Sequence, residues 1–171
     1  MYVSDFIKFE LDRIKQATDK AVGDLTPAEL KWQPKSECNP IGLLYFHMAR
    51  AEDRFVQEFI QKKPRIWESD KWYDRVGLPA DDAGGMGYTP EQVAAFVPPE
   101  LKKMQDFSSA VHDKTVEYLK NMSDAKFDEK ITIPRFGEVT VGNVWTIILA
   151  HLRQHCGEIS YMRGLQRGLN K

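Results

Sequence analysis

Four stretches of the sequence repeat apolar residues every three or four positions, and this periodicity is the strongest constraint on the fold. The stretches cover residues 3–22, 41–64, 99–122 and 141–168. Such spacing places the apolar side chains on one face of an α-helix, whereas a half-buried strand would need strict alternation. Four long amphipathic helices bury their apolar faces by packing against one another. The sequence therefore predicts an all-α four-helix bundle.

The connections between these helices carry capping and turn residues. Thr26, Pro27 and Glu29 have the pattern of a capping box with proline at the first helical position, which predicts a short helical turn. Thr89-Pro90-Glu91 predicts a second turn for the same reason. Residues 130–134 and 137–140 have short extended character, so we expect a small hairpin or extended link before the last helix.

Residues 64–89 form the longest connection and show no helical period. They include four glycines and two prolines together with the aromatic residues Trp67, Trp72, Tyr73 and Tyr88. A loop of this length in a compact domain usually has a function. The sequence leaves open whether these aromatic rings contact a ligand, form a dimer contact or make a satellite core.

Length, composition and charge narrow the class of protein. A chain of 171 residues is long enough for one domain with a full core and short for two, so residues 1–171 are expected to form a single domain. Apolar residues make up 42% and charged residues 29%, as in globular proteins. The 24 basic and 25 acidic residues are scattered and give a formal net charge of -1, so neither nucleic acid nor an anionic membrane is an expected partner.

The first 14 residues carry charges every few positions, which argues against a signal peptide or a membrane span. We therefore expect a cytoplasmic protein. Cys38 and Cys156 are the only cysteines, and in a reducing compartment two free thiols are expected rather than a disulfide.

Three of the four histidines lie on the predicted buried faces of two helices. His151 and His155 differ by about 40° around the helix axis and about 6 Å along it, so both rings can reach one ion. His47 lies beside the apolar stripe of the 41–64 helix. Because an unpaired imidazole is costly in a core, and because bundles build metal sites from facing helices, these residues are candidate metal ligands. The alternative is that each is a hydrogen-bonded core residue.

Glu158 lies close to the face of His151 and His155, where it has three candidate roles. It could accept a hydrogen bond from a ligand histidine, serve as a fourth ligand, or be a surface carboxylate that balances Arg163 or lysine residues. Cys156 is offset by about 100° from its histidine neighbour and is expected to point elsewhere.

Three protein ligands would leave a coordination position open for water or substrate, as in catalytic sites. Leu152 follows His151, so the His-Glu-x-x-His motif is absent and a metalloprotease of that type is excluded. His112 is flanked by Asp113 and Lys114 and is expected to face solvent. No catalytic residue can be assigned beyond the candidate ligands and Glu158.

Several motifs, taken in this order, resemble the DinB superfamily of DinB/YfiT-like four-helix-bundle metalloproteins, and the resemblance covers nearly the whole chain. They are Leu-Thr-Pro-Ala-Glu-Leu-x-Trp-x-Pro at 25–34, Ile-Gly-x-Leu-x-x-His-Met-Ala at 41–49, Gly-Met-Gly-Tyr-Thr-Pro-Glu at 85–91 and His-x-x-x-His at 151–155. The resemblance assigns the metal ligands to His47, His151 and His155. It also implies an up-up-down-down bundle with a long crossover, a homodimer, and a divalent ion such as zinc or nickel.

Characterised members of that family include thiol-dependent S-transferases and isomerases that activate a low-molecular-weight thiol at the metal. Two functions follow as hypotheses. The first is a metal-dependent transferase in which the aromatic 64–89 loop closes over an apolar electrophile, with a metal-dependent hydrolase as its variant. The second is a non-catalytic module that binds a metal or a small ligand.

Overall fold

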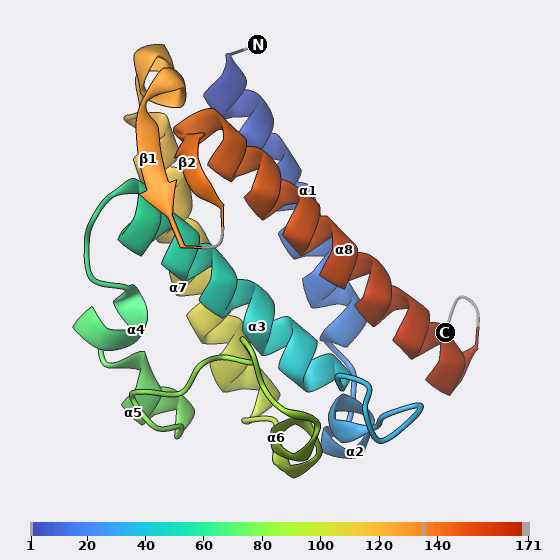
Figure 1. Cartoon of the computed structure of the whole chain (residues 1–171). Coiled ribbons are helices and arrows are strands. Elements are labelled where there is room, and N and C mark those ends of the chain that lie inside the picture. The colour runs from blue at the N-terminus through green and yellow to red at the C-terminus, as the bar shows by residue number, and fades with distance from the viewer. Residues whose placement is uncertain (1, 135, 169–171) are drawn as a thin grey trace.

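The computed structural model of the protein describes residues 2–134 and 136–168, and four long helices dominate it (Figure 1). Their bounds are α1 (Val3–Val22), α3 (Ile41–Asp53), α7 (Leu101–Lys120) and α8 (Val141–Arg167). Helix α3 continues directly into the π-helical segment η1 (Arg54–Ile60). All four periodic stretches are therefore helical, and the predicted all-α class is confirmed.

The shorter elements occupy the connections. Thr26 and Glu29 form the predicted capping box of α2 (Pro27–Lys31), and Thr89 caps the second predicted turn. Residues 64–89 were expected to lack helical structure, but they contain two short helices. The elements of the crossover are α4 (Ile66–Ser69), α5 (Trp72–Val76) and α6 (Pro90–Ala95).

A 3₁₀-helix and a hairpin connect α7 to α8. They are η2 (Asp124–Asp128), β1 (Lys130–Ile133) and β2 (Gly137–Thr140). The two strands are antiparallel, with Ile131 opposite Val139. The predicted hairpin before the last helix is therefore confirmed, and Thr140 ends it as the N-cap of α8.

The directions of the long helices differ from the expected order. Arg163 and Arg167 near the end of α8 bind Asp24 just after α1, so these two helices are parallel neighbours. Gly42 at the start of α3 lies against Pro98 just before α7, so these two helices are also parallel. If the direction of α1 is called up, the four helices run up, down, down, up in chain order; in Figure 1, α1 and α8 both run from top to bottom. The expected up-up-down-down order is wrong.

The lengths of the connections explain this order. Residues 23–40 turn the chain round at one end of the bundle, which makes α1 and α3 antiparallel (Figure 1). Only the connection between α3 and α7 returns along the bundle, as a parallel pair requires. An up-up-down-down bundle would need a second crossover of that kind.

The core continues from the bundle into the crossover. Trp67 is fully buried, with its ring 5.5 Å from Phe46 and 5.3 Å from Phe107, and Trp72 also lies against Phe107. The hypothesis that these two tryptophans close over a substrate is wrong, because α7 covers them. Tyr73 packs beside them at 6.4 Å from Trp67, so these three rings extend the main core instead of forming a separate satellite.

Two charged residues of α3 attach the crossover to the bundle. The Asp53 carboxylate accepts hydrogen bonds from the backbone N–H groups of Ile66 and Trp67, at 2.9 and 3.1 Å. The Arg50 guanidinium lies 3.9 Å from the Trp67 ring and donates to the carbonyl oxygen of Asp82 at 2.6 Å. Together they hold the glycine turn (residues 84–87), which follows Asp82, against α3.

Two further sequence expectations concern the whole chain. Both Cys38 and Cys156 are free, as predicted. Among the helices of residues 2–134 and 136–168, none has the length and apolar composition needed to cross a membrane.

Candidate metal centre

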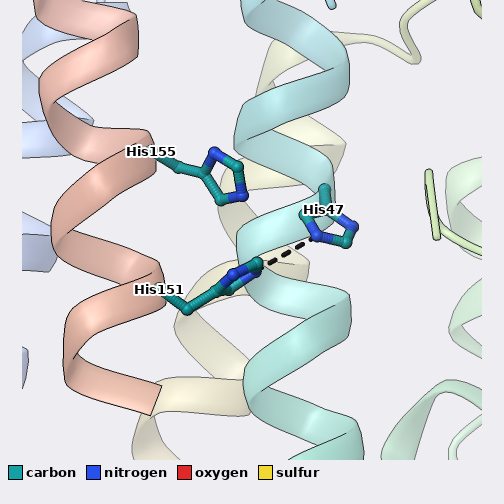
Figure 2. Close-up of side chains that lie close together, drawn as sticks. All are labelled: His47, His151 and His155. Carbon is teal, nitrogen blue, oxygen red and sulfur yellow. Dashed lines mark hydrogen bonds between the residues drawn. The ribbon is translucent and has the colours of Figure 1, made fainter. Parts of the chain in front are cut away.

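Three histidines converge between α3 and α8 (Figure 2). His47 comes from α3, and His151 and His155 come from successive turns of α8. One nitrogen from each ring lies within 4.8 Å of the others, and Nε2 of His47 is 3.1 Å from Nε2 of His151. The structure thus brings together the three residues that helical spacing and burial selected.

Hydrogen bonds to the opposite ring nitrogen orient two of these imidazoles. His47 Nδ1 donates to the carbonyl oxygen of Gly84 at 2.7 Å, and His155 Nδ1 donates to the Glu158 carboxylate at 2.6 Å. Because both partners are acceptors only, the proton belongs on Nδ1 and Nε2 carries the lone pair. In His47 this lone pair faces Nε2 of His151 in a 3.1 Å hydrogen bond, which an ion bound there would replace. Metal-bound histidines have the same pattern of outer hydrogen bonds.

The geometry distinguishes among the three roles considered for Glu158. Its carboxylate accepts from His155 and from Gln154 Nε2 at 2.8 Å, whereas Arg163 pairs with Asp24. Burial on its own would raise the pKa of Glu158, but these hydrogen bonds outweigh burial and lower it. An ionised Glu158 is therefore placed as a hydrogen-bond acceptor for His155.

Burial keeps two of the rings neutral. The pKa of His151 is lowered from 6.5 to about 4, first because burial disfavours the charged ring and then because His155 and His47 lie close to it. Burial also lowers the pKa of His47, although its bond to Gly84 opposes the shift. Neutral imidazole is the form that binds a metal ion, so both rings are ready to bind one at neutral pH.

The three histidines fit a divalent ion. Zinc–nitrogen distances of about 2.0–2.1 Å in a tetrahedral site place two ligand nitrogens about 3.3 Å apart. The 3.1 Å between the Nε2 atoms of His47 and His151 is close to this value. Within the described residues, this group of possible ligands contains His47, His151 and His155 and no fourth member. A bound ion would keep an open coordination position.

The cluster opens into a pocket of about 460 Å³ with mostly apolar walls. One wall comes from α3 and η1, a second from the glycine turn, a third from the hairpin and a fourth from α8. The lining residues beside His47 and His151 are Ala51, Arg54, Phe55, Phe59, Gly85, Met86, Gly87, Ile133, Pro134, Phe136 and Ile147.

Comparison with known proteins agrees with this architecture. Residues 10–159 match the sequence profile of the DinB superfamily. The chain belongs to the DinB superfamily. A crystal structure described as the conserved protein of a locus from Enterococcus faecalis has a similar fold, with a TM-score of 0.85 and 23% sequence identity over 96% of this chain and 97% of that chain. At that identity the likeness shows a shared fold alone. No curated protein matches the sequence.

The pocket of this DinB superfamily member contains residues that sequence reasoning missed. Phe55 and Phe59 belong to the apolar stripe of the 41–64 stretch, and in the structure they also line the pocket, with ring centroids 5.5 Å apart. The helical period could have indicated part of this wall. Ala51 and Phe55 follow His47 by one and two turns, and Ile147 precedes His151 by one turn. The π-helical turns of η1 carry the wall further, and such turns are frequent at functional sites.

The part of the 64–89 loop that reaches the site is the glycine turn. Gly84 and Gly85 have positive φ values of 62° and 83°, a region that favours glycine. A side-chain carbon on Gly85 would lie 3.1 Å from Leu43 and 3.5 Å from the His47 Cβ. The absence of side chains there lets the backbone approach His47. Tyr88 instead donates to Asp82 at 2.6 Å.

His112 was expected to face solvent, but the structure places it at an interface between helices. Its side chain is only 12% exposed, and its Nε2 lies 2.9 Å from the carboxylate of Asp12 on α1. The acidic and basic residues beside it in sequence suggested a surface position, but a partner 100 residues away decides where the ring lies.

Proposed function

We propose that this protein binds one divalent metal ion through His47, His151 and His155 and transfers a small thiol to an apolar electrophile. The observation that carries the proposal is the convergence of three imidazoles, without a fourth protein ligand among the described residues, beside an apolar pocket. A bound zinc or nickel ion would supply an open position at which a thiol loses its proton.

The chain's own residues have separate tasks in this proposal. Gly84 and Glu158 fix the rings of His47 and His155 through Nδ1, which directs the Nε2 atoms inward. The rings of Phe55 and Phe59 provide an apolar wall that excludes water and accepts an apolar molecule. A pocket of this size with mostly apolar walls supports a small molecule as the ligand.

The composition of the pocket favours thiol transfer over hydrolysis. Hydrolysis usually needs a general base close to the attacking water, and no Asp or Glu is among the described lining residues. A thiol needs no such base once it is ionised, because the thiolate is itself the nucleophile. Glu158 is bound to His155 and Gln154, which leaves it as a positioning residue.

The test uses purified protein loaded with zinc or with cobalt as a spectroscopic substitute. We expect one ion per chain by elemental analysis, a thiolate-to-cobalt absorption band when 2-mercaptoethanol is added, and transfer of that thiol to a chloronitrobenzene that chelation abolishes and zinc restores. His151→Ala should lose all three, while His112→Ala should keep them. Metal binding without the band or the transfer would favour the non-catalytic binding module, and no metal binding would overturn both.

A further inference from the structure

Arg54 is the only permanently charged side chain among the described residues that line the pocket, and we propose that it binds a carboxylate of the pocket's ligand. The inference rests on the proposed function, because it names a chemical class for the small molecule used at that site. The ligand would combine an apolar or aromatic body with one carboxylate group.

Not every N–H group of Arg54 has a hydrogen-bond acceptor in the protein. Its Nε is buried without a hydrogen-bond partner and lies 3.6 Å from Glu58 Oε2, which is too long for a good hydrogen bond. That Glu58 oxygen is also 3.6 Å from Nε of Arg65. Arg54 Nη1 donates to the thioether sulfur of Met86 at 2.9 Å, and a thioether is a weak acceptor. The guanidinium therefore has donor capacity that the protein does not use.

Although its Nε is buried, the Arg54 side chain lines the pocket and is partly open to a ligand. The side chain is 29% exposed, and the guanidinium lies 5.2 Å from the centre of the Phe59 ring, which supports it by a cation–π contact. No acidic residue is among the described lining residues. The carboxylate nearest to Arg54 belongs to Glu58, which lies outside this lining, and Arg54 shares it with Arg65. In an apolar pocket the attraction between this cation and an anion is stronger than in water. A guanidinium also matches the two oxygens of a carboxylate.

The neighbouring arginine shows what a structural role looks like in the same helix. Arg50 lies one turn earlier, is only 5% exposed and stacks on Trp67. It donates to the backbone of Asp82 and does not line the pocket. Arg54 has an open approach, a weak thioether partner and an apolar surface beside it. This difference favours ligand binding at Arg54.

The first experiment measures binding by calorimetry to metal-free protein, so its result does not depend on the proposed metal chemistry. The probes are 3-phenylpropionate and its neutral isostere 3-phenylpropanamide. We expect the carboxylate to bind about tenfold more tightly than the amide. Arg54→Gln should remove this preference, Arg54→Lys should keep part of it, and Arg75→Gln should leave it unchanged, because Arg75 is exposed and lies over Trp72.

A second arm tells whether the carboxylate belongs to the thiol or to the acceptor. Cobalt-loaded protein is titrated with 3-mercaptopropionate and with 3-mercaptopropanol, and the absorption band reports binding. A carboxylate on the thiol predicts that Arg54→Gln weakens only the first thiol, by about tenfold. A carboxylate on the acceptor predicts equal effects on both thiols, with the preference of the first experiment intact.

The proposal is overturned if the wild-type protein binds 3-phenylpropionate and its amide equally, or if correctly folded Arg54→Gln keeps the preference. Circular dichroism checks the folding of each variant, and Arg54→Lys provides the charge-retaining comparison. Failure of metal binding together with an intact carboxylate preference would reject the thiol chemistry and leave the Arg54 site standing. The reverse result would reject this site alone.

Discussion

The bundle holds histidines at two opposite interfaces, and they are satisfied in different ways. His112 of α7 faces α1, where its Nε2 lies 2.9 Å from the carboxylate of Asp12. At the α3–α8 interface, Nε2 of His151 faces Nε2 of His47 at 3.1 Å. Nε2 of the first ring has an anionic partner inside the protein, whereas the Nε2 atoms of the second pair face each other. The comparison distinguishes a histidine that stabilises the fold from histidines whose Nε2 atoms could bind a ligand.

The surroundings strengthen this contrast. Burial would raise the pKa of Asp12, but hydrogen bonds from Lys8 and His112 outweigh it and lower the pKa, so the carboxylate remains ionised. Among the described residues, the carboxylate bound to the three-histidine cluster lies on its outer side, where Glu158 accepts from His155 Nδ1. The inner nitrogens face one another and the pocket. A cation between them would satisfy all three at once.

Removing one ligand should produce the largest effect. His151→Ala leaves two imidazoles, and we expect the affinity for zinc to fall by more than the roughly 100-fold that changes outside the ligand set cause. Competition with a chromogenic chelator measures this affinity. The matched variant His112→Ala should bind zinc normally but lose about 1–3 kcal/mol of unfolding free energy, because Asp12 loses its partner. Equal zinc affinities in the two variants would contradict the view that the α3–α8 interface binds zinc and the α1–α7 interface does not.

Removing the outer carboxylate should have the next largest effect. In Glu158→Gln the charged acceptor of the His155 N–H becomes a neutral amide, so we expect zinc affinity to fall by about 10- to 100-fold. Asp12→Asn makes the same chemical change beside His112 and should leave zinc affinity unchanged. If Asp12→Asn weakened zinc binding as much as Glu158→Gln, general destabilisation would explain both results.

The sequence predicted what depends on local geometry. Capping residues such as Thr26 and Thr140 act within one turn, and the helix bounds followed from them and from the apolar period. The pairing of His151 with His155 is local to one helix. His47 joined them because its place on a buried stripe limits where its ring can lie. These positions need no knowledge of distant contacts.

What the sequence did not predict depends on contacts between distant segments. Trp67 and Trp72 are buried because α7 places Phe107 against them. His112 is partly buried because Asp12 faces it across the bundle. The pocket role of Arg54 follows from the π-helical turns that continue α3. Helix direction likewise depends on which connection carries the crossover. Periodicity contains none of this information.

The stability of the metal-free protein should depend on pH through the histidine cluster. The pKa of His151 is about 4 in the folded state and near 6.5 when unfolded, so the unfolded state binds more protons between these values. The contribution of neutral His151 to the free energy of unfolding is therefore fully present above about pH 6.5 and is lost as the pH drops toward 4. We expect a loss of about 1–2 kcal/mol, because the three neighbouring rings titrate together. Urea unfolding in the presence of a chelator measures the change. His151→Gln should flatten this profile, and an unchanged slope would show that His151 is not the source.

The smallest effect should come from the glycine turn that connects the crossover to the cluster. Gly84 and Gly87 both have positive φ, so alanine at either position costs about 1 kcal/mol in backbone strain. Only at Gly84 would the new carbon meet another side chain, at 2.7 Å from Arg50, whereas Gly87 has open space. Because the Gly84 carbonyl orients His47, we expect Gly84→Ala to weaken zinc binding by less than about tenfold, below the effect of Glu158→Gln. Gly87→Ala should lose about the same unfolding free energy from backbone strain but keep the zinc affinity of the wild-type protein. Equal zinc affinities would mean that the turn supports His47 without determining its orientation.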